Sequence, residues 1–366
     1  MRSAVTTKGS KRRWFTIASL TLILCTLASA GAIAQMTPAA HVGVGQKRHP
    51  ATLEVLAFDK SAARPAKKYR IAYLAECTNN PYCRTRLAGV KAAARKYGFD
   101  FKIFDANFNP ATQLRLVQDA VARGYDGYLF APTAAGPGCS MWTRYLRPTG
   151  KPVVTVDIPM CNDADYTPGL AATVTMVRQA FFDAHVENAF KTCTKPCKVA
   201  ALGGFTGSDL FTIWERAIRR AAAKYPKVDV VSDQPGNYDP RVALRVTGDV
   251  LLAHPDLDLI ISSWDDMTRG AEQAIKAVGK RPGKDIGIYT TGATKDAVTK
   301  VKSGVYNETS IFLPFEESYY GAVALIMALK GAPVNGYVNE AELPAVTRLG
   351  SIFVTKKNAN RFKPNY

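Results

Sequence analysis

Acidic and aromatic side chains recur where the apolar, strand-like runs of this chain end. Asp157 closes one such run, Tyr238 and Asp239 follow another, and Trp264 and Phe312 stand at the ends of two more. Carboxylates form hydrogen bonds with hydroxyl groups, and flat rings cover the apolar C–H faces of a sugar and exclude water. Packing explains any single loop ring equally well, but recurrence at equivalent strand ends predicts a ligand-binding cleft.

The segment 76–83, Glu-Cys-Thr-Asn-Asn-Pro-Tyr-Cys, carries the strongest local signal. It follows an apolar run and precedes a helical pattern, with Asn80 suited to the N-cap and Pro81 to the first helical position. Such a turn presents free backbone N–H groups together with Glu76, Asn80 and Tyr82. In an open α/β sheet it lies beyond the carboxyl ends of the strands, where ligands bind.

Groups able to carry out catalysis are scarce. Two of the four histidines, His41 and His49, lie in a segment of weak periodicity, and the helical apolar pattern around His185 predicts a packed side chain. The chain contains no P-loop, no Gly-x-Ser-x-Gly elbow and no His-Glu-x-x-His motif. The turn 203–207 resembles a phosphate-binding turn but lacks its lysine, so a tight turn explains it better. We therefore predict no enzymatic activity, no cofactor and no bound metal.

Residues 1–34 have the pattern of a secretory signal peptide. Basic residues precede an apolar run, 14–28, and small-x-small cleavage signals end at Ala30 and Ala34. We predict cleavage after Ala34, with Ala30 as the alternative. The pair Arg12-Arg13 leaves the twin-arginine route open, and Cys25 leaves a lipoprotein open. No later run is long and apolar enough to span a bilayer, so we expect an exported, soluble protein.

The chain is strongly basic, with a formal net charge of +18, of which +13 remains after the predicted cleavage. Its lysines and arginines are spread along the sequence, which is typical of solvated helix faces and linkers. Export also removes the protein from DNA, so we predict no nucleic-acid partner. The basic surface would favour anionic ligands or an anionic membrane face.

Six cysteines remain after the predicted cleavage, and an even number in an exported chain predicts disulfides. Six cysteines allow 15 pairings, and we favour the local one. Zinc is the alternative, but the cysteine spacing is irregular and no histidine lies near any of the six. The favoured pairs are Cys77–Cys83, Cys139–Cys161 and Cys193–Cys197.

From Tyr69 onward, strand-like runs alternate with helical patterns. This alternation predicts parallel sheets covered by helices, and its restart near Met176 predicts two tandem, doubly wound α/β lobes. Residues 35–67 show weak periodicity and are predicted to form a loose N-terminal arm. The predicted strands are 69–75, 100–105, 127–132, 152–158, 198–202, 228–232, 257–263, 286–291 and 309–313, with a further strand-like run at 346–354.

The stretch from Tyr69 to Val354 resembles the ribose-binding protein family, the periplasmic type I solute-binding proteins of ABC importers. Each motif is weak alone, and their shared order makes the resemblance specific. The motifs are Asn79-Asn80-Pro81-Tyr82, Asn107-Phe108-Asn109-Pro110, Val117-Gln118-Asp119, Ala131-Pro132-Thr133, the run 152–157, Tyr238-Asp239, Ala253-His254-Pro255-Asp256, Asp265-Asp266-Met267 and Leu313-Pro314.

The resemblance implies two lobes that are joined by three crossings and close around one ligand. It implies a periplasmic, monomeric protein that delivers a small solute to an inner-membrane permease. The first lobe is then expected at 68–173 plus 314–346, the second at 174–313 plus 347–366, and the crossings near 173–175, 312–314 and 346–349.

The resemblance also implies a set of ligand-binding residues. In the family pattern Asn80 and Tyr82 contact the sugar, and Asp157 binds its hydroxyl groups. Tyr238 stacks on the ligand, and Glu76 carries a binding side chain in some relatives. The remaining predicted positions align with other family contacts: Trp214, Trp264, Asp265, Thr291 and Phe312.

Several of the polar contacts in the family pattern are changed here. Trp264 replaces an asparagine, Thr291 an aspartate and Phe312 a glutamine, and two family arginines fall at Ile158 and near Trp214. Cys83 stands where the family has a second aromatic residue. A charge-assisted hydrogen bond contributes about 1.5–3 kcal/mol, so we expect weak affinity for free ribose. The expected ligand is a deoxy or substituted sugar, a cyclitol, a glycoside or a small aromatic-bearing molecule.

Three other functions remain as alternatives. A ligand sensor for chemotaxis uses the same binding chemistry and has the same sequence signature. A regulator of the lactose-repressor type shares the two-lobe fold, but a signal peptide holds the place of its helix-turn-helix. A sugar-acting enzyme would require Glu76 and Asp157 as its acid–base pair.

Overall fold

The computed structural model describes residues 51–162, 165–176 and 178–366. The predicted signal peptide and residues 35–50 of the predicted arm lie outside the described residues. The described residues belong to one compact unit of the chain. None of their helices is long and apolar enough to cross a membrane.

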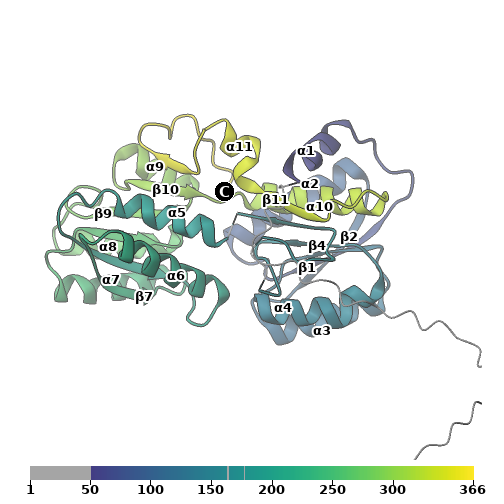
Figure 1. Cartoon of the computed structure of the whole chain (residues 1–366), viewed down its shortest axis with the longest axis horizontal. Coiled ribbons are helices and arrows are strands. Elements are labelled where there is room, and N and C mark those ends of the chain that lie inside the picture. Colours follow the sequence, from purple (N-terminus) through teal and green to yellow (C-terminus); the bar gives the residue numbers. More distant parts are fainter. Residues whose placement is uncertain (1–50, 163–164, 177) are drawn as a thin grey trace, which may run out of the picture. The chain divides into compact units, whose positions relative to one another are not determined.

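Two six-stranded sheets form the framework, in the orders β11-β5-β4-β3-β1-β2 and β12-β10-β9-β8-β6-β7 (Figure 1). Among the described strands all neighbours are parallel except β10 and β12. The first sheet contains β1 (Arg70–Ala75), β2 (Asp100–Asp105), β3 (Gly127–Phe130), β4 (Val153–Val156), β5 (Ala172–Thr175) and β11 (Gly336–Asn339). The second contains β6 (Cys197–Gly203), β7 (Val228–Pro235), β8 (Leu259–Ser262), β9 (Gly287–Gly292), β10 (Glu308–Ile311) and β12 (Phe353–Thr355).

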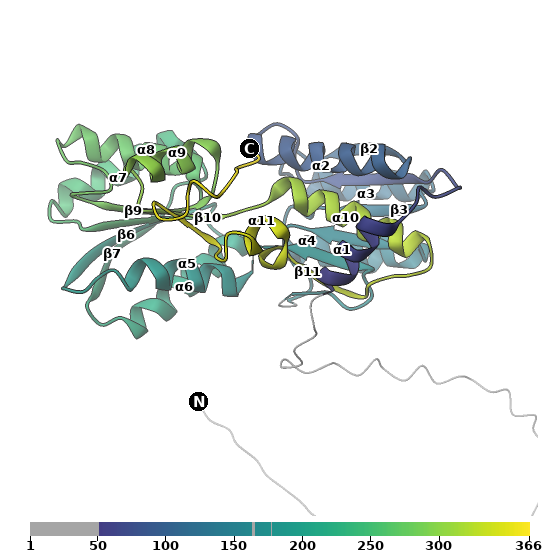
Figure 2. The same cartoon turned by 90° about the horizontal axis from the view of Figure 1, so that it is seen from above.

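Helices cover both faces of each sheet. The first sheet is accompanied by α1 (Thr52–Ser61), α2 (Pro81–Tyr97), α3 (Pro110–Ala122), α4 (Ala135–Met141), the short turns η1 (Trp142–Leu146) and η2 (Arg147–Thr149), and α10 (Pro314–Leu329). The second is accompanied by α5 (Gln179–Phe190), α6 (Asp209–Lys224), α7 (Pro240–Ala253), α8 (Asp265–Ala277) and α9 (Lys295–Ser303). Figure 2 shows α7, α8 and α9 on one face of the second sheet and α5 and α6 on the other.

The alternation of side chains along β1 explains this layering. Ile71 and Tyr73 belong to the same hydrophobic cluster as buried residues of α2 and α10. Ala72 and Leu74 point to the opposite face and belong to the cluster that contains residues of α3 and η1. A strand buried on both faces is a continuous apolar run, as parallel sheets require.

The chain passes between the two sheets three times. It leaves the first sheet after β5 and enters α5, which packs on α6. It returns after β10 into α10, which packs on α2 and β4. It leaves again after β11 through η3 (Glu340–Glu342) and α11 (Pro344–Thr347) to reach β12. The predicted class of two tandem parallel α/β lobes is confirmed by this topology.

Four local predictions differ from the structure. Residues 52–61 of the predicted loose arm form helix α1, and its Val55 packs in the hydrophobic core. The strand-like run 346–354 divides into part of α11 and part of β12. The four-residue strands β5 and β11, which pair with each other at the edge of the first sheet, were not predicted. The alternation, which was expected to restart near Met176, resumes with helix α5 from Gln179.

The structure joins the six described cysteines in the three local pairs favoured from the sequence. The pair Cys77–Cys83 closes the turn between β1 and α2, with its Cα atoms 5.8 Å apart. The pair Cys139–Cys161 joins α4 to the loop after β4, with a Cα separation of 4.9 Å. The first of these disulfides therefore constrains the turn that carries Asn80 and Tyr82.

Candidate functional site

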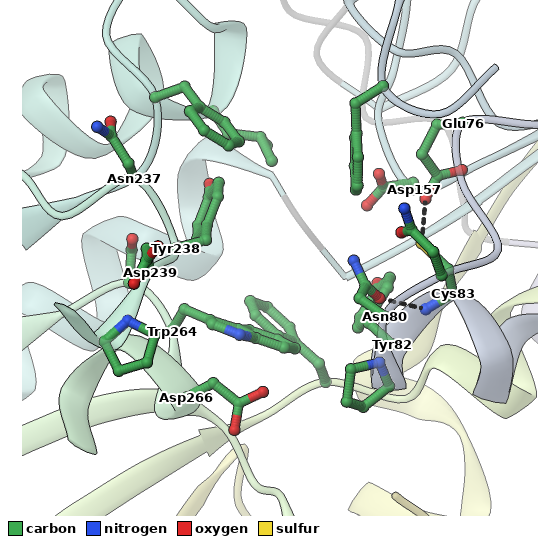
Figure 3. A pocket seen from close by; sticks show the side chains of 18 of the residues that line it. Glu76, Asn80, Tyr82, Cys83, Asp157, Asn237, Tyr238, Asp239, Trp264 and Asp266 are labelled. Carbon is green, nitrogen blue, oxygen red and sulfur yellow. Dashed lines mark hydrogen bonds between the residues drawn. The ribbon is translucent and has the colours of Figure 1, made fainter. Parts of the chain in front are cut away.

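A cavity of about 650 Å³ lies where the carboxyl ends of strands from both sheets meet. Figure 3 shows Glu76, Asn80, Tyr82 and Asp157 on one side of this pocket and the labelled residues of the second lobe on the other. The polar lining residues are Glu76, Asn79, Asn80, Asp157, Asn237, Asp239, Arg241, Ser263 and Asp266. The aromatic ones are Tyr82, Phe108, Phe182, Phe205, Tyr238, Trp264 and Phe312.

The turn between β1 and α2 forms the first wall as the sequence predicts. Asn80 caps α2 by accepting a hydrogen bond from the backbone N–H of Cys83 at 2.8 Å, and Pro81 begins the helix. Glu76 follows β1 directly, and Tyr82 lies in the first turn of α2. Because helix and strand are fixed by the packing around them, these side chains are held on the pocket wall.

Two equivalent turns place one aromatic residue each in the pocket. Asn107-Phe108-Asn109-Pro110 follows β2, and Asn237-Tyr238-Asp239-Pro240 follows β7. Phe108 has a φ of 58° and Tyr238 a φ of 52°, in the left-handed region that bulky residues rarely adopt. Such strained backbone persists where the surrounding structure enforces it, commonly at ligand sites. The same turn conformation therefore places an aromatic side chain in the pocket in each of the two lobes.

Rings from the two lobes touch inside this region. Tyr82 contacts Trp264 with ring centroids 5.6 Å apart and Phe312 with centroids 6.4 Å apart, both edge to face. Trp264 and Phe312 stack at 6.1 Å. Trp264 is the N-cap residue of α8, and Phe312 follows β10 at the second crossing between the sheets. Ligand-sized apolar surface is thus supplied jointly by both lobes.

The sequence model of the family described as "Periplasmic binding protein domain" matches residues 71–333. The chain belongs to this periplasmic binding protein family. The match includes every residue that lines the pocket and all strands of both sheets except β11 and β12, which lie beyond residue 333.

Curated relatives of this periplasmic binding protein have names that refer to sugars. The ribose import binding protein RbsB of Salmonella typhimurium is 27% identical over 276 residues, which cover 75% of this chain and 89% of the relative. The D-allose-binding periplasmic protein of Escherichia coli is 25% identical over 296 residues, 78% of this chain and 91% of the relative. The ribose-binding family assignment made from the sequence motifs is confirmed.

Solved structures of ABC transporter binding proteins share the fold. One from Actinobacillus succinogenes with bound D-allose superposes with a TM-score of 0.69 at 19% identity, covering 81% of this chain and all of the other. One from Bacillus halodurans with bound myo-inositol gives a TM-score of 0.71 at 17% identity, covering 81% of this chain and 98% of the other. At these identities the likeness establishes the fold, a type I periplasmic binding protein.

Seven of the ten ligand-binding residues predicted for this periplasmic binding protein line the pocket. Their ability to contact a ligand stays a prediction, supported by where their side chains lie. They are Glu76, Asn80, Tyr82, Asp157, Tyr238, Trp264 and Phe312.

The other three do not line the pocket, which corrects their predicted placement. Trp214 is fully buried and packs against Phe182 and His185. Asp265 accepts hydrogen bonds at 2.9 Å from the Thr294 backbone N–H and the Thr309 hydroxyl. Thr291 donates its hydroxyl to the backbone oxygen of Ser263 at 2.6 Å. All three residues therefore belong to the framework of the second lobe rather than to the pocket wall.

Sequence reasoning missed several lining residues. Phe108 lies in the Asn-Phe-Asn-Pro motif after β2, and the similarity of this motif to the turn of Tyr238 could have identified it as a lining residue. Phe205 stands in the turn 203–207, which was interpreted only as a tight turn. Phe182 lies in a helix, where a single ring has no distinguishing pattern.

Glu76 and Asp157 also belong to a buried group of charges around Arg86. Nη1 of Arg86 contacts Oε1 of Glu76 and lies 3.7 Å from Oδ2 of Asp157, and its Nε lies 3.5 Å from Oε2 of Glu317. Arg86 is fully buried on α2, and Glu340 of η3 is buried as well. The Tyr82 hydroxyl donates to Oε2 of Glu317 at 3.0 Å. One guanidinium therefore faces an excess of carboxylates next to the cavity.

Burial raises the pKa of these carboxyl groups. The pKa of Glu76 is raised to about 7 by burial, against the opposing effect of Arg86. The pKa of Glu317 is raised to about 8 for the same reason, with the nearby carboxylates adding to the rise. The pKa values of Asp157 and Glu340 are also raised by burial. These carboxyl groups therefore hold their protons to a higher pH than carboxyl groups in water do.

Glu76, Cys77 and Cys83 have ligand atoms within 4.8 Å of one another, as a metal site would require. The two sulfurs are joined to each other, so neither is a thiolate that binds a metal. We assign no metal to this group.

Replacing Gly204 by alanine is expected to weaken ligand binding roughly tenfold or more. A Cβ at this position would lie 2.3 Å from the ring and hydroxyl of Tyr238, so this ring must move away from its place on the pocket wall. Loss of an aromatic anchor from a binding site typically costs more than about 1 kcal/mol of binding free energy. Gly248→Ala in α7 is the matched control, because a Cβ there meets nothing within 4 Å. Equal ligand affinity in the two variants, measured by calorimetry, would contradict the role of Tyr238.

Proposed function

We propose that this protein is the substrate-binding component of an ABC importer. It works in the periplasm as a monomer without a cofactor, captures a sugar-like or other cyclic solute and delivers it to an inner-membrane permease. The observation that carries the proposal is the pocket lined by rings and acids from both lobes. Membership of a family of transport binding proteins supports a role in binding rather than catalysis.

The lining supports a ligand other than free ribose. Trp264, Phe312 and Cys83 border the pocket at positions where the ribose-binding pattern has other residues, two of them polar. Relatives named for galactofuranose and D-allose, and a neighbour with bound myo-inositol, support a ring-shaped polyhydroxylated or related solute. The seven rings favour a ligand that presents extended apolar faces.

Capture follows from the arrangement of the two walls. A ligand that contacts residues of both lobes has more contacts when the walls approach each other, so its binding energy favours the closed arrangement. A chemotaxis sensor would also close around its ligand. Binding of the closed protein to a permease distinguishes a transport role from a sensing role.

Trp264 gives a direct test of capture. Titrating the ligand-free protein with sugars, deoxy sugars, cyclitols, glycosides and small aromatic solutes is expected to change tryptophan fluorescence for at least one class. The change should be lost in Trp264→Phe, while calorimetry still detects binding, because phenylalanine retains an apolar ring there. Absence of binding by every class, or turnover of a bound compound, would contradict the proposal.

A further inference from the structure

The charged groups that line the pocket are mostly acidic, although the chain as a whole is basic. They are Glu76, Asp157, Asp239 and Asp266 against the single cation Arg241. Arg241 is already paired with Asp239, its Nη2 lying 2.8 Å from Oδ2. No cation of the lining is therefore left for an anionic ligand.

The carboxylate of Asp157 is the least compensated of these acids. Its charged partner among the described residues is Nη1 of Arg86 at 3.7 Å, and Arg86 is held more closely by Glu76. No side chain in the described part of the chain donates a hydrogen bond to it. The residue keeps a left-handed backbone, with a φ of 80°, directly after β4. This geometry presents an acceptor of hydrogen bonds and of positive charge to the cavity (Figure 3).

The rings that share the pocket with Asp157 are suited to the same charge. A cation within about 6 Å of an aromatic face is attracted by the negative face of the ring, more strongly where water is excluded. Tyr82 already has such a contact, with the Arg86 guanidinium carbon 5.6 Å from its ring centroid. Tyr238, Trp264 and Phe312 line the same cavity and have no cation in the contacts recorded among the described residues.

We infer that the captured solute carries a positive charge, as a protonated amine or a quaternary ammonium group on a cyclic body. The charged group binds Asp157, and the ring system of the solute lies among Tyr82, Tyr238 and Trp264. The inference rests on the proposed function, because it names the chemical class of the solute held in that same pocket. It goes beyond that function by replacing hydroxyl recognition with charge recognition.

The acids around Asp157 give the binding a definite pH dependence. Burial raises the pKa of Asp157, with Arg86 opposing the rise. The titratable groups around this carboxylate come from both lobes. They are Glu76, Arg86, Glu317, Glu340 and the phenols of Tyr82 and Tyr238. A cationic solute favours the ionised carboxylate, so its binding releases protons and its affinity rises with pH as Asp157 ionises. A neutral solute has no such requirement.

Matched pairs of probes test the inference on the ligand-free mature protein. The pairs are cyclohexylamine with cyclohexanol, benzylamine with benzyl alcohol, and benzyltrimethylammonium with benzyl alcohol. At pH 8 at least one cationic member is expected to bind about tenfold more tightly than its neutral partner, by calorimetry. Asp157→Asn should reduce this preference to within about twofold, and asparagine tolerates the left-handed backbone. Asp285→Asn is the control and should keep the preference, because that carboxylate pairs with Arg281 and does not line the pocket.

The outcomes separate the inference from the proposed function. Neutral members that bind as tightly as the cationic ones, or more tightly, overturn the inference and leave solute capture intact. A preference that survives Asp157→Asn overturns the role of this carboxylate. If no probe and no compound of the solute panel binds, the proposed function fails and the inference fails with it.

Discussion

Replacing Arg86 by methionine is expected to lower the free energy of unfolding by about 3–5 kcal/mol at pH 7.5. The guanidinium is fully buried, and Glu76, Asp157 and Glu317 lie within 3.7 Å of its nitrogens. Methionine has a similar length and no charge, so the carboxylates would face one another without a cation. They must then take up protons or stay ionised in a desolvated place, and either change costs stability.

Two further variants accompany this prediction: one is a control at an exposed arginine, and the other tests the coupling between Arg86 and Glu76. Arg220→Met removes an exposed arginine that pairs with Asp183 at 2.9 Å, and it should change the unfolding free energy by no more than about 0.5 kcal/mol. Glu76→Gln combined with Arg86→Met should cost less than Arg86→Met alone, because one unpaired carboxylate is gone. Urea unfolding at constant pH measures all three. A cost for Arg86→Met no larger than that of Arg220→Met would show that the buried charges do not depend on this arginine.

The sequence pattern of α2 places Arg86 on the buried face of the helix but does not identify its charged partners. Buried positions of α2 recur at Cys83, Arg86, Val90, Ala93 and Tyr97, at steps of three and four residues. An arginine on the apolar face of a helix signals a buried ion pair, since charged side chains are rarely fully buried unless paired. The periodicity of the helix could be recognised in the sequence. Two partners of Arg86, however, are Asp157 after β4 and Glu317 on α10, which lie far along the chain and are not linked to it by any local pattern.

The site was predicted best where local chemistry decides the structure. The Asn-Pro and Asp-Pro pairs fix helix starts after β1, β2 and β7, so turn chemistry predicted the positions of Asn80, Tyr82 and Tyr238 at the pocket, while their ligand contacts stay a prediction from the family pattern. Trp214 and Thr291 were placed by alignment with the family pattern instead, and the structure buries both. Side-chain direction depends on packing against distant elements, which spacing along one strand or helix does not specify.

The buried acids connect the pocket to the segments that join the two lobes. Glu317 lies in the first turn of α10, just after the second crossing, and Glu340 lies in η3 at the start of the third. Tyr82 touches Glu317 through its hydroxyl and Trp264 through its ring. A change in the charge of Glu317 therefore affects a residue of the pocket wall, Tyr82, and also the segment that connects the two lobes before α10.

The ligand-free protein is expected to be more stable at pH 5–6 than at pH 8, by on the order of 2–4 kcal/mol. The pKa of Glu76 is raised to about 7 and that of Glu317 to about 8 in the folded protein, mainly by burial. An unfolded glutamate has a pKa of about 4.3, so between these values the folded state binds more protons than the unfolded state. Stability then falls as the pH rises from about 5 to about 8. The groups interact, so the total is smaller than the sum of separate shifts.

Glu317→Gln isolates the contribution of one of these groups. Glutamine keeps an acceptor for the Tyr82 hydroxyl and never ionises, so the variant should lose less stability between pH 5 and pH 8 than the original protein and exceed it at pH 8. The exposed Asp285, whose pKa is lowered to about 2 by Arg281, titrates below this window, so Asp285→Asn should leave the slope unchanged. Urea midpoints at pH 5, 6, 7 and 8 measure the slope. Stability that stays level or rises over this range, or an unchanged slope in Glu317→Gln, would mean that the buried carboxyl groups do not hold these protons.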